Sequence, residues 1–137
     1  MHEVIIFLQT FDKYKQFTYQ ELWLHIQPSF FNNQYKIFRD EDKKIFGFIN
    51  WAWVDEKTKE QYFKTGKVKK WKCGNNLVTV NFVAKKNILQ IVRWCKKEST
   101  KIMGVNKQVN WLRMDKNFII KKIKKIQTKG SWLWETQ

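Results

Sequence analysis

The sequence predicts an α/β (α+β) fold, in which helices pack against a single mixed sheet. Two observations lead to this prediction. Apolar residues recur at helical spacing near the N-terminus and then alternate, as in strands, through the middle of the chain. The 137 residues include one proline and five glycines and show no repeat or linker. We therefore expect one domain over residues 1–137, with 127–137 as a basic, tryptophan-containing tail.

The N-terminal part of the chain is expected to be helical. Residues 2–12 predict a short helix and residues 13–17 a loop. A second helix begins at Thr18, which can form a capping box with Glu21. Pro28 is expected to bend or shorten this helix, because proline lacks an amide hydrogen and clashes with the preceding turn. The apolar face of the helix comprises Tyr19, Leu22, Trp23, Ile26 and Phe30.

The middle of the chain predicts strands separated by a helix. The segments "YKIF" and "IFGFINWAWV", joined by the polar turn "RDEDKK", are typical of a hairpin that begins at Tyr35. Next, "DEKTKEQYFKTG" predicts a short helix that ends at Gly66. The segment "NNLVTVNFVA" is the most strand-like of the chain, because it is rich in β-branched residues.

The last third predicts one more helix and further extended segments. In "NILQIVRWCKK" the helical inner face would comprise Ile88, Ile91, Val92 and Cys95. The segments "TKIMGVN" and "QVNWLRM" are expected to be extended. The segment "FIIKKIKKI", residues 118–126, fits both a strand and an amphipathic helix, and we favour the strand.

The net charge of +15 indicates an acidic partner, which could be nucleic acid, an anionic membrane or an acidic protein. Only Arg39, Arg93 and Arg113 are arginines, so sequence-specific reading of DNA bases is not expected. Cys73 and Cys95 lack the spacing of a zinc site and are expected to be free thiols in a reducing, cytoplasmic compartment. The apolar segment "VIIFL" is too short to span a membrane.

Several ordered segments resemble a known family. "QYKIFRDEDKKIFGFINWAWV", "EKTKEQYFKTGKV" and "WKCGNNLVTVNFVAK" are similar to the RTX toxin-activating lysine acyltransferases, the hemolysin activators, and especially to short relatives in phage genomes. The resemblance covers about residues 12–105. It implies a mainly antiparallel sheet of N-acetyltransferase type and the transfer of a fatty acyl group from acyl carrier protein to lysines of a protoxin in the cytoplasm.

The same resemblance implies two catalytic positions, and both are changed in this chain. Where the family has a histidine before the second helix, this chain has Tyr14 in "YKQF". Where the family has a catalytic aspartate in the central strand, this chain has Asn81 in "VNFVAK", and Lys85 replaces a proline. The pKa of tyrosine is about 10 and that of histidine about 6.5, so a phenol is a poor base near neutral pH. His25 is spaced about three helical turns from Tyr14, so we expect a partly buried helix-edge residue and not a catalyst.

These substitutions predict a catalytically degenerate pseudoenzyme, retained for binding or as a structural component of a phage particle in the host cytoplasm. An active acyltransferase that uses acyl carrier protein is one alternative, and a non-specific nucleic-acid-binding protein is another. We expect no metal, because Cys73 and Cys95 lack zinc-site spacing and only His2 and His25 could assist them. We expect no other cofactor, because the chain has no glycine-rich phosphate loop and no glycine in "KKNIL", where a coenzyme A site would need one.

The basic C-terminal region is the predicted binding surface. Trp23, Trp51, Trp53, Trp94 and Trp111 lie within expected elements and are assigned to the core. The predicted binding residues are Lys121, Lys122, Lys124, Lys125, Trp132 and Trp134. Tryptophans beside lysines are typical of interfaces, although docking onto the domain itself is an equal alternative for the two tail tryptophans.

Overall fold

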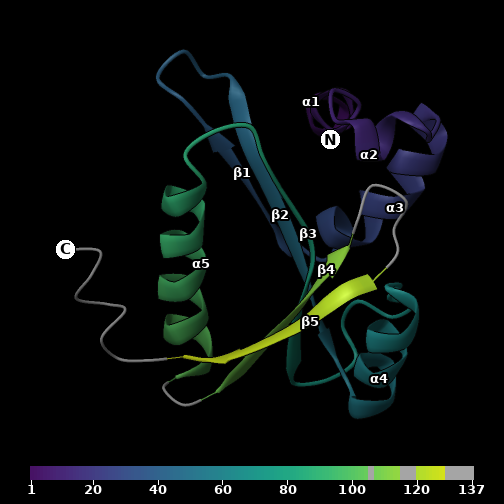
Figure 1. The fold of residues 1–137 in the computed structure, drawn as a ribbon, viewed down its shortest axis with the longest axis vertical. Helices are drawn as coiled ribbons and strands as arrows, with labels where there is room; N and C mark the ends of the chain where they lie inside the picture. The colour runs from purple at the N-terminus through teal and green to yellow at the C-terminus, as the bar shows by residue number, and fades with distance from the viewer. Residues whose placement is uncertain (105–106, 115–119, 129–137) are drawn as a thin grey trace.

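The structure is a computed structural model that describes residues 1–104, 107–114 and 120–128. These residues form five helices and five strands, an α+β fold (Figure 1). In chain order the elements are α1 (His2–Leu8), α2 (Asp12–Lys15), α3 (Tyr19–Phe31), β1 (Tyr35–Arg39), β2 (Ile45–Val54), α4 (Glu56–Thr65), β3 (Asn76–Ala84), α5 (Ile88–Met103), β4 (Gln108–Met114) and β5 (Ile120–Gln127).

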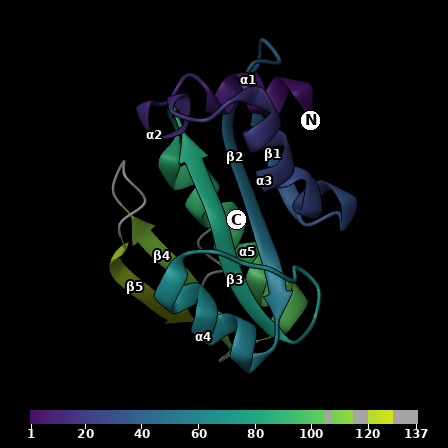
Figure 2. The same cartoon turned by 90° about the vertical axis from the view of Figure 1, so that its right-hand side faces the viewer.

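The strands form one mixed sheet in the order β1-β2-β3-β4-β5. All neighbouring strands are antiparallel except β3 and β4, which are parallel and are connected through α5. Helix α5 covers one face of the sheet, and α1 to α4 lie on the other (Figures 1 and 2). The predicted mixed, mainly antiparallel sheet with packed helices is therefore confirmed.

The N-terminal helices agree with the sequence in one respect and differ in two. The capping box is confirmed, because Thr18 Oγ1 accepts from the Glu21 amide at 3.1 Å and Glu21 Oε1 accepts from the Thr18 amide at 3.0 Å. The prediction of a loop over 13–17 is wrong, since Asp12–Lys15 forms the short helix α2. The first helix is also shorter than the predicted 2–12, because α1 ends at Leu8. Pro28 lies inside α3, which continues to Phe31.

The hairpin β1-β2, helix α4 and strands β3, β4 and β5 occur where the sequence predicts them. Gly66 ends α4 with φ of 72°, a left-handed conformation that glycine adopts without strain. Two predictions about α5 are wrong. The helix continues through "TKIM" to Met103, and Ile88 is 55% exposed because it lies in the first turn, beyond the packed part of the helix.

The sheet opens into a fork between β3 and β4. The two strands pair only at Leu77–Val109, Val78–Asn110 and Thr79–Trp111, and β3 then continues without β4 (Figure 2). On the other side of β3, the register with β2 passes from Asn50–Asn81 to Trp51–Thr79, so Val80 is an extra residue. Such a bulge bends its strand, which explains why β3 leaves β4 at this point. Asn81 follows the bulge directly.

Candidate active site

The two positions implied by the resemblance meet beside the fork. Tyr14, on α2, donates a hydrogen bond from Oη to Asn81 Oδ1, on β3, at 2.9 Å. Both residues are buried, since Tyr14 is 3% exposed and Asn81 is 5% exposed. The structure therefore brings together a phenol and an amide that lie 67 residues apart in the sequence.

Asn81 is held by a second amide that sequence reasoning missed. The backbone amide and Nδ2 of Asn81 both donate to Asn50 Oδ1, at 2.8 and 2.9 Å. Asn50 Nδ2 donates to Ser29 Oγ at 3.1 Å, and Ser29 Oγ donates to the Ile26 carbonyl at 2.7 Å. Asn50 and Ser29 are fully buried. The sequence signal was an amide in the middle of the apolar strand "FGFINWAWV", because a buried polar group requires partners.

His25 reaches the same centre from α3, which contradicts the expected separation from Tyr14. Its Nε2 lies 3.2 Å from Asn81 Oδ1, the oxygen that Tyr14 also contacts. The spacing argument failed because α2 and α3 are separate helices, and the chain turns at Gln16 and Phe17 between them. His25 is exposed as a whole residue, whereas its hydrogen bond to Asn81 is partly buried.

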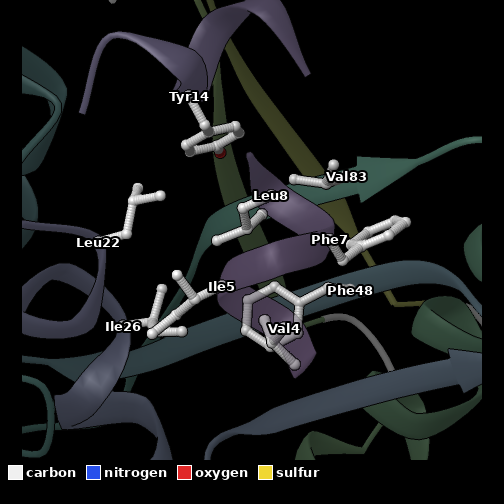
Figure 3. Packing of buried hydrophobic residues seen from close by; sticks show 9 residues of the cluster. All are labelled: Val4, Ile5, Phe7, Leu8, Tyr14, Leu22, Ile26, Phe48 and Val83. Atoms are coloured by element: carbon white, nitrogen blue, oxygen red, sulfur yellow. The ribbon is translucent and has the colours of Figure 1, made fainter. Parts of the chain in front are cut away.

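The two titratable groups have different environments. Tyr14 belongs to an apolar cluster with residues such as Leu8, Leu22 and Val83 (Figure 3), and burial raises its pKa above the ordinary value of tyrosine. For His25, desolvation lowers the pKa, the hydrogen bond to Asn81 opposes this change, and the charge of Lys13 lowers the pKa further. Near neutral pH the phenol is therefore protonated and the imidazole uncharged.

An apolar groove lies on the opposite face of the sheet, under α5. Trp51 and Trp53 of β2 both line it, because residues two apart on a strand share a face, and so does Trp94 of α5. Cys95 also lines it, and burial raises the pKa of this thiol to about 12. None of the residues around Asn81 lines this groove, so the two features are separate.

The predicted basic surface is only partly described. Lys122 and Lys125 are exposed on β5, the edge strand, and Lys125 Nζ lies 4.9 Å from the ring centroid of Phe63. Lys124 is half-buried, and for Lys121 only its place in β5 is described. Trp132 and Trp134 lie outside the described residues.

Within the described part of the chain, Cys73 and Cys95 are unpaired, and histidine, cysteine and acidic residues form no cluster that could hold a metal ion. None of the helices described is long and apolar enough to cross a membrane.

Fold and centre together define an α+β protein with a buried polar centre beside a fork in its mixed sheet, and the α+β class is the one predicted from the sequence. The chain belongs to the RTX toxin acyltransferase family, whose pattern matches residues 1–129. No individual curated protein matches the chain.

Proposed function

We propose that this protein transfers a fatty acyl group from acyl carrier protein to the side-chain amine of a protein lysine. The observation that carries the proposal is the centre at Asn81. It is a buried, hydrogen-bonded polar site beside the fork, and an exposed histidine contacts it. The family's described activity is acyl transfer in RTX toxin activation. Position 81 keeps a hydrogen-bonding side chain, although it lacks the charge of the aspartate implied there.

Tyr14 does not supply the base in this proposal. A buried phenol with a raised pKa stays protonated at neutral pH, and its hydrogen is already donated to Asn81. Its role is to hold the amide of Asn81 and to fill the apolar cluster. Transfer therefore requires a proton acceptor other than the residue at position 14.

The charge of the protein supports an acidic donor. The net charge is +15, and Lys122 and Lys125 are exposed along the edge strand β5. Complementary charge speeds association and aligns partners, and its effect decreases as salt screens it. We expect complexes with acyl carrier protein to weaken as the salt concentration rises.

The test is a transfer assay with acyl carrier protein charged with a fatty acyl chain and an RTX-repeat protein as acceptor. Release of free carrier thiol and a matching gain of mass on an acceptor lysine are the expected results. Carrier and acceptor without this protein provide the background. Thiol release without lysine modification, or no release at all, contradicts the proposal.

A second candidate is the pseudoenzyme predicted from the sequence, which binds without transfer or serves as a structural component of a phage particle. The burial of Tyr14 favours it, since the position of the family histidine holds no usable base. This candidate predicts salt-sensitive binding of acyl carrier protein without transfer. It also predicts that the double variant Tyr14→His/Asn81→Asp, which restores the implied pair, gains transfer activity over the unchanged protein.

A further inference from the structure

One group, the backbone amide of Asn81, determines which partner donates and which accepts in the hydrogen bonds around this residue. A backbone amide can only donate, and the amide of Asn81 points to the side chain of Asn50 at 2.8 Å. The Asn50 atom at that position must therefore be the oxygen Oδ1. Asn50 Nδ2 then faces Ser29 Oγ, which accepts from it and donates onward to the Ile26 carbonyl. The donor and acceptor roles of all these groups therefore agree with the backbone amide of Asn81 acting as a donor.

The same reasoning orients the side chain of Asn81. Its terminal atom lies 2.9 Å from Asn50 Oδ1, and since that oxygen is an acceptor, the Asn81 atom must be the donor Nδ2. The oxygen of Asn81 therefore points the other way, toward Tyr14 and His25. The phenol donates to it at 2.9 Å.

The tautomer of His25 follows from this orientation. An amide oxygen can only accept, so His25 Nε2, which lies 3.2 Å from Asn81 Oδ1, must carry a hydrogen. A neutral imidazole has one N–H, so the lone pair is on Nδ1. An asparagine that orients a histidine in this way also occurs in cysteine proteases, where the amide replaces the usual carboxylate.

We infer that His25 is the general base of this protein, through Nδ1, and that Asn81 is the residue that positions it. The inference rests on the proposed function. It places the base on α3, whereas the resemblance implied a base at position 14. The hydrogen-bonded series from Ser29 to Asn81 holds the amide that positions this base.

The reaction step is a direct transfer. The neutral amine of the acceptor lysine attacks the thioester carbonyl, and a C–N bond forms. The nitrogen becomes positively charged, and its proton passes to His25 Nδ1. The C–S bond breaks, and the departing carrier thiolate takes the proton from the imidazolium. The products are an amide on lysine and the free thiol of the carrier, and His25 returns to its neutral form.

The decisive variant is His25→Gln, because the glutamine amide keeps a donor for Asn81 and lacks a base. Transfer should fall by about 10²- to 10⁴-fold, the range of general-base contributions. The matched control is His2→Gln, since His2 is the other histidine and contacts only Tyr19 among the hydrogen bonds described. His2→Gln should transfer at the original rate. If His25→Gln transfers at that rate as well, the inference is refuted and the proposed function stands. If the unchanged protein gives no transfer, the proposed function fails and the base role fails with it.

The tautomer has its own readout, independent of activity. Nitrogen NMR of the ¹⁵N-labelled protein at neutral pH should show His25 with a protonated Nε2 and an unprotonated Nδ1. In Asn81→Ala the imidazole loses its orienting acceptor, and we expect a mixture of tautomers with slower transfer. A dominant Nδ1–H form in the unchanged protein would overturn the inference. So would an unaltered tautomer in Asn81→Ala.

Discussion

The substitution Asn50→Ala removes the group on which the centre depends. Asn50 Oδ1 accepts two hydrogen bonds from Asn81, one from the backbone amide and one from Nδ2. Both donors are buried, since Asn81 is 5% exposed, and neither has another acceptor among the hydrogen bonds described. An orphaned buried donor costs about 1–3 kcal/mol, so the variant should lose roughly 2–6 kcal/mol of unfolding free energy. For a domain whose total stability is about 5–15 kcal/mol, this is a large fraction.

The assay is urea denaturation followed by tryptophan fluorescence, with Ser29→Ala as a graded control. Ser29→Ala removes the acceptor of one buried donor, Asn50 Nδ2, so its cost should be about half as large. A loss of less than about 1 kcal/mol in Asn50→Ala would refute the reasoning, because it would mean that the two donors of Asn81 find other partners. A greater loss in Ser29→Ala than in Asn50→Ala would refute it equally.

Three further predictions follow from the structure. Tyr14→Phe keeps the ring in the apolar cluster and leaves the hydrogen bond between His25 and Asn81 Oδ1 in place. We expect the unfolding free energy to fall by about 1 kcal/mol and transfer to stay within about tenfold of the original rate. Complete loss of transfer in a folded variant would identify the phenol as a catalyst. The pKa of His25, which lies beside Lys13 and Tyr14 of α2, is lower in the folded protein than in the unfolded chain. Below about pH 6.5 the unfolded chain therefore binds the proton more readily than the folded protein. The free energy of unfolding should decrease as the pH falls through the folded pKa. Denaturation midpoints measured from neutral to mildly acidic pH should therefore fall less in His25→Gln than in the unchanged protein, and equal slopes would contradict this prediction. A Cβ at Gly74 would overlap the backbone of Val54 and Asp55. Gly74→Ala should therefore destabilise the fold by at least the roughly 1–3 kcal/mol typical of overpacking. A thermal midpoint equal to that of the unchanged protein would contradict this close contact.

Local features of the fold were predictable because their causes lie within a few residues. Thr18 and Glu21 are three positions apart, and their reciprocal bonds need no other part of the chain. Gly66 ends α4 because its own backbone adopts a left-handed conformation, which glycine allows. The C-terminal end of α5 was less predictable, because the residues after Cys95 have little helical apolar pattern. In the structure the helix nevertheless continues to Met103.

The candidate site was only half predictable, because its geometry depends on pairing between distant segments. Tyr14 and Asn81 were found through the resemblance, but nothing in the sequence shows that His25, 56 residues from Asn81, bonds to the same oxygen. The bulge at Val80 is a property of register between β2 and β3, which the residues of β3 alone do not specify. Asn50 was visible as an amide in an apolar strand, yet its partner could be named only once the strands were aligned.

The short parallel contact between β3 and β4 has a consequence for how the molecule opens. Eight residue pairs join β2 to β3, whereas three join β3 to β4. Strands β4 and β5 are therefore expected to behave as a separate cooperative unit that detaches before the rest of the sheet. Amide protons in hydrogen bonds between β3 and β4 should exchange with deuterium at a lower opening free energy than those between β2 and β3. The fork would then be the place where the protein first comes apart.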